Sequence, residues 1–164
     1  MTDVLFEKYL GDIISGDGKN KKNIKARVTK LLGVISNIMN ILREVSLGQY
    51  YFVIARLLRE TMFLSVMLLN SETWLNMTQS DIEELESVDR TLLRRILEAP
   101  VSTPGPALHL ELGCAPVRLI IQAKRILLLK YILSRSKEEL ISKVFWAQND
   151  EPIKNDWWLQ HCQK

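Results

Sequence analysis

Hydrophobic residues recur at three- and four-residue steps in the segment that begins at Asn20. This spacing places them on one face of an amphipathic helix. The apolar positions are Ile24, Val28, Leu31, Leu32, Ile35, Ile38, Met39 and Leu42. We therefore predict one long helix that ends near Arg43–Val45, before a short segment that contains Gly48.

A second helix is predicted over residues 49–69, which are strongly apolar. The length and hydropathy of residues 50–69 are close to those of a membrane span. However, Arg56, Arg59 and Glu60 lie in the middle of this stretch, and charged side chains are costly in lipid. A helix buried in a protein core is therefore favoured, and no membrane partner is expected.

Capping residues predict a third helix that starts at Thr78. Thr78 precedes Asp81 by three residues, which is close to a capping box, and Pro100 ends the apolar stripe that follows. Several acidic residues load the first turns of this helix, where they suit the positive end of the helix dipole. The acidic stretch is therefore explained by helix stability and needs no substrate.

The segment 101–113 contains Pro and Gly and is predicted to be a break with a single helical turn inside it. Pro116 favours a following helix over about 117–133, because proline is common at the first helical position. A second capping-box pattern at Ser136-Lys137-Glu138-Glu139 predicts a last helix through about Gln148.

Residues 6–14 differ from the rest, because aromatic and β-branched residues alternate loosely there and a Gly/Asp/Ser cluster follows. We predict a short strand, either half of a small hairpin or an edge strand. Gly11 lies in the middle of the run, where glycine marks a bulge or a close backbone approach. A lone strand leaves backbone groups unpaired, so its sheet partner is expected here or outside the chain. The predicted fold class is mainly α, a helical bundle preceded by a short β-strand or hairpin.

The composition supports one packed domain of 164 residues, with 47% hydrophobic and 25% charged residues. Two cysteines and two histidines are too few for a disulfide framework or a self-contained zinc site. We therefore expect an intracellular, reducing compartment and no bound metal or cofactor in this chain. His109 and His161, the latter next to Cys162, lie in no recognisable nucleophile motif, so no active site is predicted.

The net charge of +3 conceals two basic ends and an acidic middle. Residues 1–43 hold 8 basic and 4 acidic residues, residues 44–115 hold 5 and 10, and residues 116–164 hold 9 and 5. Six basic residues lie within residues 19–30, which contain no acid: Lys19, Lys21, Lys22, Lys25, Arg27 and Lys30. Positive charge at a helix start opposes the dipole, yet helix N-termini with added lysines are natural phosphate sites. The cluster predicts contact with a nucleic-acid backbone, and a solvated helix face is the alternative.

A second basic set lies on the helix predicted after Pro116. Arg118 and Arg125 are seven residues apart and share a face, with Lys124, Lys130 and Arg135 near its edge. The aliphatic stems of these side chains could equally cover a surface helix, so this set favours neither reading.

The order of these elements resembles the primer-grip strand, thumb and post-thumb region of non-LTR (LINE-type) retrotransposon reverse transcriptases. The resemblance rests on an ordered series of segments along nearly the whole chain. These are residues 6–14 with Gly18-Lys19-Asn20, then Leu57-Leu58-Arg59-Glu60, Asn70-Ser71-Glu72-Thr73-Trp74, residues 81–86, residues 92–97, Leu110-Glu111-Leu112-Gly113 and Pro116-Val117-Arg118.

The resemblance implies a thumb that grips a template–primer duplex, RNA–DNA or DNA, through its phosphates. Lys19, Lys21, Lys22, Lys25 and Arg27 would contact the backbone. The primer-grip-like residues, which would hold the primer end, are Tyr9, Leu10 and Gly11. Three parts are expected: a primer-grip-like strand and turn at 1–18, a thumb-like bundle at 19–99, and a Pro-containing loop with helices packed on the bundle at 100–164.

The family's catalytic aspartates lie upstream of the primer grip, and the chain contains no Asp-Asp pair. Two-metal phosphoryl transfer needs such carboxylates, so we predict a fragment of an RNA-directed DNA polymerase that is inactive alone. The full polymerase would use Mg²⁺, and its palm and fingers are possible partners of the fragment. The alternative function is a helical protein–protein interaction module without nucleic-acid binding.

Overall fold

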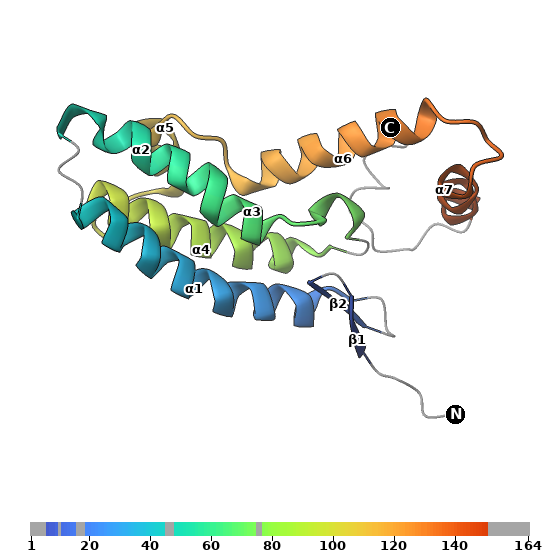
Figure 1. Cartoon of the computed structure of the whole chain (residues 1–164), viewed down its shortest axis with the longest axis horizontal. Coiled ribbons are helices and arrows are strands. Elements are labelled where there is room, and N and C mark those ends of the chain that lie inside the picture. Colours follow the sequence, from blue (N-terminus) through green and yellow to red (C-terminus); the bar gives the residue numbers. More distant parts are fainter. Residues whose placement is uncertain (1–5, 10, 16–18, 45–47, 75–76, 151–164) are drawn as a thin grey trace.

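The computed structural model describes residues 6–150, except 10, 16–18, 45–47 and 75–76, and shows a mainly helical protein with one small hairpin (Figure 1). The hairpin consists of β1 (Phe6–Tyr9) and β2 (Asp12–Ser15), paired antiparallel with Tyr9 opposite Asp12. The predicted single run of residues 6–14 is thus two strands. Gly11 makes the turn with φ 91°, a backbone conformation that glycine adopts without steric cost.

Three helical layers form the bundle beside the hairpin. α1 (Lys21–Glu44) and α4 (Gln79–Leu97) pack against each other along much of their length. The third layer is a continuous helical stretch of η1 (Gly48–Tyr50), α2 (Tyr51–Leu58), the π-helical segment η2 (Arg59–Phe63) and α3 (Leu64–Met67). The periodicity predicted all three layers within a few residues of their observed ends.

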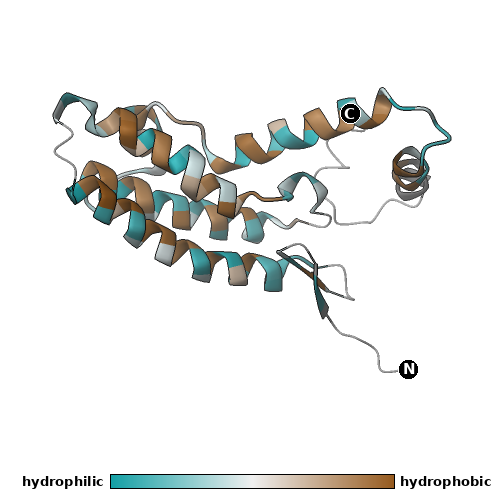
Figure 2. Ribbon diagram, in the orientation of Figure 1, coloured by the Kyte–Doolittle hydropathy of each residue, from teal (hydrophilic) through white to brown (hydrophobic). Residues whose placement is uncertain are grey.

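The apolar stripes of these layers meet in one core. Hydrophobic and hydrophilic residues alternate around each helix of the bundle in Figure 2. Core side chains that are at most 1% exposed include Ile24, Leu31, Ile35, Ile38, Phe63, Met67, Leu85, Leu92, Leu93 and Ile96. Thr78 caps α4 as predicted, since its side chain accepts a bond from Asp81 N–H and the Asp81 carboxylate accepts one from Thr78 N–H.

The remaining helices follow a short 3₁₀ turn, η3 (Ser71–Thr73). α5 (Gly105–Leu112) packs on α4, and α6 (Val117–Leu133) packs on α4 and η3. α7 (Leu140–Asp150) contacts α6. The predicted capping box at Ser136 is wrong, because the Ser136 hydroxyl accepts a bond from Glu138 N–H in a turn and the helix begins only at Leu140.

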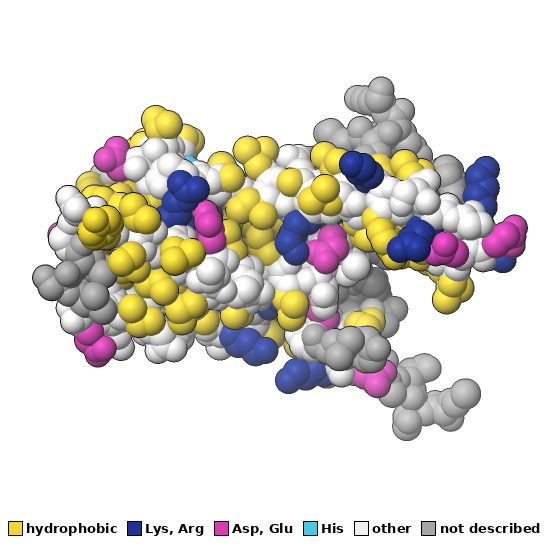
Figure 3. All heavy atoms as spheres, turned by 45° about the horizontal axis from the view of Figure 1, so that its top comes forward, with side chains coloured by type: hydrophobic (Ala, Val, Ile, Leu, Met, Phe, Trp, Pro, Cys, Tyr) yellow, Lys and Arg dark blue, Asp and Glu magenta, His cyan; other side chains and the backbone are white. Residues whose placement is uncertain are grey.

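Large apolar side chains also remain on the surface. Figure 3 shows hydrophobic side chains gathered at the end of the molecule where α2 begins. Tyr50, Phe52, Val53 and Leu57 are exposed there. Phe52, Val53 and Leu57 line a hollow together with Leu112 of α5, and we call the four exposed residues the α2–α5 apolar patch.

An ion pair lies in the middle of the core. Arg59 of η2 and Asp89 of α4 are 1% and 0% exposed and are joined by two hydrogen bonds of 2.8 Å, from Nε to Oδ1 and from Nη2 to Oδ2. Nη2 also donates to the Ala115 carbonyl at 3.0 Å, just before α6. The sequence predicts that Arg59 lies in a buried helix, but it does not indicate which acidic residue pairs with it.

We predict that Asp89→Asn lowers the free energy of unfolding by about 3–5 kcal/mol, because it leaves the Arg59 charge buried without its partner. Replacing both residues, Arg59→Met with Asp89→Leu, costs less because no charge is stranded. Urea unfolding followed by circular dichroism measures both. The control is Arg56→Met, since Arg56 pairs with Glu60 on the surface and such pairs contribute at most about 1 kcal/mol. The prediction is contradicted if Asp89→Asn lowers the free energy of unfolding no more than Arg56→Met does.

Candidate nucleic-acid interface

The lysines of the predicted phosphate-binding cluster lie on the surface at the start of α1. Lys19, Lys21, Lys22 and Lys25 are all exposed, and the first turn of α1 contains no acidic residue. At about 100° per residue, the three lysines within the helix fall in an arc of about 100°. We call Lys19, Lys21, Lys22 and Lys25 the α1 lysine face. The structure thus brings four of the five predicted residues together.

Arg27, the fifth residue, is directed into the protein and does not fit a phosphate contact. It is 4% exposed and lies on the same side of α1 as the core residue Ile24. Its guanidinium makes an ion pair with Asp12, donates to the Val66 carbonyl at 2.7 Å and lies 4.9 Å from the centre of the Trp74 ring. The assignment of Arg27 to the nucleic-acid backbone is therefore corrected: it is a structural residue beneath the lysine face.

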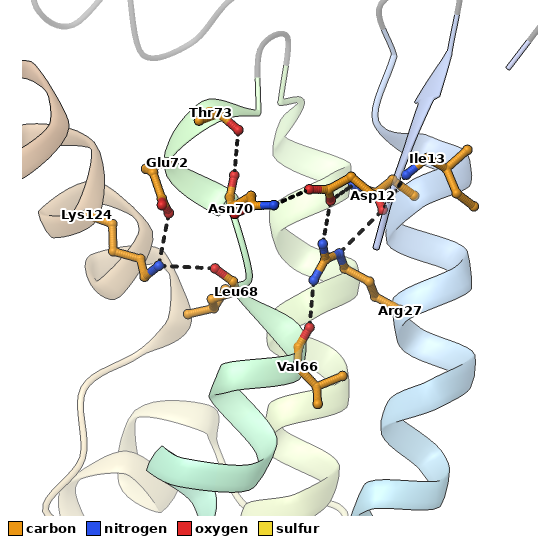
Figure 4. A network of polar contacts seen from close by, with 10 residues as sticks. Asp12, Ile13, Arg27, Val66, Leu68, Asn70, Glu72, Thr73 and Lys124 are labelled. Carbon is orange, nitrogen blue, oxygen red and sulfur yellow. Dashed lines mark hydrogen bonds and ion pairs between the residues drawn. The ribbon is translucent and has the colours of Figure 1, made fainter. Parts of the chain in front are cut away.

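Asp12 is the centre of a partly buried polar network, shown in Figure 4. One carboxylate oxygen accepts bonds from Arg27 and from Asn23 Nδ2 (2.8 Å), and the other accepts a bond from Asn70 Nδ2 at 2.7 Å. The Asn23 side-chain oxygen in turn accepts a bond from Ile13 N–H at 3.3 Å. These contacts fasten the hairpin to α1 and to the segment before η3.

The network also sets the protonation of Asp12. Burial alone would raise the pKa of this carboxyl, but the hydrogen bonds from Asn70, Asn23 and Arg27 and the Arg27 charge outweigh it. The pKa therefore lies below the ordinary 3.8, and the carboxylate stays charged in the folded protein.

Two of the three primer-grip-like residues, Tyr9 and Gly11, lie at the tip of the hairpin. Tyr9 ends β1, Leu10 lies outside the described residues, and Gly11 is the exposed turn residue. A Cβ at Gly11 would stand 3.6 Å from Leu69 Cδ2, so the turn has ordinary room for one and glycine is needed for its positive φ. The hairpin packs on α1, which places its tip at the same end of the molecule as the lysine face.

The second basic set does not form one surface. Arg125 is 3% exposed and donates to the Trp74 carbonyl, while Lys124 donates to Leu68 O (3.2 Å) and Glu72 (2.9 Å). Both residues join α6 to the segment around η3. The guanidinium of Arg118 approaches Glu86 at 3.8 Å, and that of Arg135 lies over the Tyr131 ring. Lys130 and Arg135 are the exposed members of this set, and Arg118 is partly exposed.

Sequence reasoning missed the polar residues that hold the interface together. Asn23 and Arg27 are four residues apart on the apolar side of α1, which is the signal that could have identified them as buried partners. Asp12 and Asn70 carry no such signal, since each joins the network through a contact distant in sequence.

The described part of the chain gives no sign of a metal site or a membrane span. No three His, Cys, Asp or Glu side chains among the described residues come together to bind a metal ion. No described helix is both long and apolar enough to cross a membrane. His161 and Cys162 lie outside the described residues.

Comparisons with known proteins give no relative. No protein-family model matches the chain, and no curated protein or solved structure matches it. The function is therefore proposed from the chain's own residues.

We predict that Asp12→Asn destabilises the protein at pH 7 by about 1–3 kcal/mol, because it weakens charge-assisted hydrogen bonds. The folded pKa of Asp12 is depressed, so its contribution is complete above the ordinary 3.8 and is lost as the pH falls below it. The stability difference between wild type and Asp12→Asn should therefore shrink in that range. Urea unfolding between pH 7 and pH 3 measures it, with Glu111→Gln as an exposed control. A difference that is constant with pH refutes the prediction.

Proposed function

We propose that this chain binds the backbone of an RNA–DNA or DNA duplex through the α1 lysine face. In this proposal it is a thumb-like, non-catalytic fragment of an RNA-directed DNA polymerase of the non-LTR retrotransposon kind. The observation that carries the proposal is the exposure of four lysines at a helix start within an acid-free segment.

The chemistry of the lysine face suits phosphate rather than a base edge or a peptide. The first amides of α1 and the helix dipole add partial positive charge to that of the lysines. Lysine ammonium groups act as point charges without the planar fork that reads guanine, so their contacts carry no sequence information. Such a surface favours binding that is independent of sequence and weakened by salt.

The Asp12 network supports the proposal by fixing the geometry of this surface. It fastens the hairpin across the first turns of α1, through Asn23, which lies between Lys22 and Lys25 in sequence, and Arg27, which follows Lys25. The lysines therefore project from a helix start that is anchored, and binding need not order the backbone that carries them.

A second candidate function is a helical protein–protein interaction module. The α2–α5 apolar patch favours it, because large apolar side chains such as Val53 (66% exposed) are commonly covered by a partner. In this function the lysines would serve solubility only.

We predict that Lys22→Glu with Lys25→Glu weakens binding to an RNA–DNA hybrid and lowers the magnitude of the salt slope, −∂log K/∂log[salt], by about 2, because two phosphate contacts are lost. The change also replaces positive with negative charge at a helix start, which the helix dipole favours, so loss of binding should occur in a folded variant. Fluorescence anisotropy with a labelled hybrid at several salt concentrations, together with thermal unfolding, measures both effects.

The matched control is Lys130→Glu with Lys143→Glu, which makes the same charge change on α6 and α7. It should reduce affinity far less and leave the slope nearly unchanged. Absence of binding at low salt, or equal losses in the two double variants, would exclude the duplex function and favour the interaction module.

A further inference from the structure

A cysteine and a histidine face each other in a groove at the end of the molecule away from the hairpin. The groove has a volume of about 610 Å³ and is lined by residues of α4, α5 and the start of α6. His109 and Cys114 both line it, and Cys114 Sγ lies 3.6 Å from His109 Nδ1. This distance is within the range of a hydrogen bond to sulfur.

The end of α5 produces this approach. Gly113 caps the helix in the left-handed conformation, with φ 63°. The chain therefore turns back, and Cys114 N–H donates to the His109 carbonyl at 2.9 Å. This turn brings the Cys114 thiol next to the imidazole of His109, which precedes it by five residues. Cys114 remains partly exposed to solvent.

The Asp89 carboxylate lies on the Nε2 side of the imidazole. Asp89 Oδ2 is 3.9 Å from His109 Nε2, and Arg59 holds the carboxylate in place through two hydrogen bonds. The negative charge on this side favours the tautomer with its proton on Nε2, in which Nδ1 accepts a proton from the thiol. Burial lowers the pKa of His109 below 6.5 and raises the pKa of the Cys114 thiol above 9.0, so both are neutral at pH 7.

The groove favours an anionic ligand. Arg90 and Arg118 line it with a single acid, Glu86, which lies 3.8 Å from both guanidinium groups. The charged groups that act on His109 or Cys114 are Arg59, Asp89, Glu86, Arg90, Arg56 and Glu60, which come from α2, η2 and α4. The lining residues beside the thiol thus carry more positive than negative charge, and the remaining lining is mostly apolar or glycine, as at Leu110.

We propose that Cys114 is a thiol–disulfide exchange site for small disulfides that carry carboxylate groups, with His109 as the proton acceptor. The thiol proton passes to Nδ1 of His109 as Sγ attacks one sulfur of the disulfide R–S–S–R. A new S–S bond joins Cys114 to one R–S group, and the original S–S bond breaks. The leaving thiolate takes the proton back from His109 and departs as R–SH. Cys114 is oxidised to a mixed disulfide and the small disulfide is reduced, so no other oxidant is required.

The test uses the full chain with Cys162→Ser, so that Cys114 is the one thiol that reacts. Oxidised glutathione is the anionic probe and cystamine the cationic one, and intact mass measures formation of each mixed disulfide. The same chain unfolded in urea gives the reference rate for each probe. We expect the native-to-unfolded rate ratio at pH 7 to be at least about tenfold higher for oxidised glutathione than for cystamine.

The role of His109 is tested with His109→Gln, after circular dichroism has shown that the variant is folded. It should slow exchange at pH 7 by at least about tenfold, and less at a pH above the thiol pKa, where no proton acceptor is needed. Arg118→Gln, a partly exposed substitution, should reduce the rate with oxidised glutathione and not with cystamine. If His109→Gln is unfolded, the Arg118→Gln variant alone tests the proposal. An equal effect of Arg118→Gln on the rates with both probes then overturns it. An unchanged pH–rate profile in folded His109→Gln, or equal native-to-unfolded ratios for the two probes, overturns the proposal.

Discussion

Arg59 and Asp89 form a fully buried ion pair, and three segments of the chain depend on its geometry. Arg59 lies in the π-helical segment of the second layer, Asp89 in α4, and the Ala115 carbonyl, which Arg59 also binds, precedes α6. Removing two charges from water is costly unless their hydrogen bonds are satisfied, so the helices must hold one register to satisfy them. The apolar core supplies most of the favourable burial, while the pair restricts how the layers can be arranged.

The Arg59–Asp89 ion pair also borders the groove beside α5 that contains His109 and Cys114. Because Arg59 fixes the Asp89 carboxylate, Asp89 presents a fixed oxygen to His109. The carboxylate charge therefore lies beside His109, and the glycine cap of α5 brings Cys114 to the other side of the ring. Asp89 thus belongs to the core ion pair and also borders the groove, so substitution of Asp89 would disturb both. For this reason, evidence on the groove must come from residues outside the core.

The sequence was sufficient to predict α1, the α2–α3 stretch, α4 and α6, because each is rich in apolar residues at helical spacing or has a recognisable start or stop. The eight residues of α5 were predicted only as a single helical turn, since this short segment has no clear apolar stripe. Thr78, Pro100 and Pro116 mark helix boundaries through local effects, which a single segment reveals. The Gly11 hairpin turn and the late start of α7 were only partly predicted or missed, since alternation and capping patterns fit more than one arrangement. The buried arginines could not be found in this way. The partners of Arg27 and Arg59 lie 15 and 30 residues away in sequence, and hydropathy alone assigns arginine to the surface.

Arginine and lysine have different places in this chain: three arginines are buried in the fold, whereas lysines lie on the surface of α1. Arg27, Arg59 and Arg125 are buried, and each guanidinium donates to a backbone carbonyl of another segment. Arg27 and Arg59 also bind a carboxylate. A lysine could not replace them, since its single ammonium cannot span the same set of acceptors. The α1 surface is left to lysines, whose charges lie at a helix start and oppose the helix dipole. In the proposed function, this unfavourable placement is offset when an anionic partner binds at the same helix start.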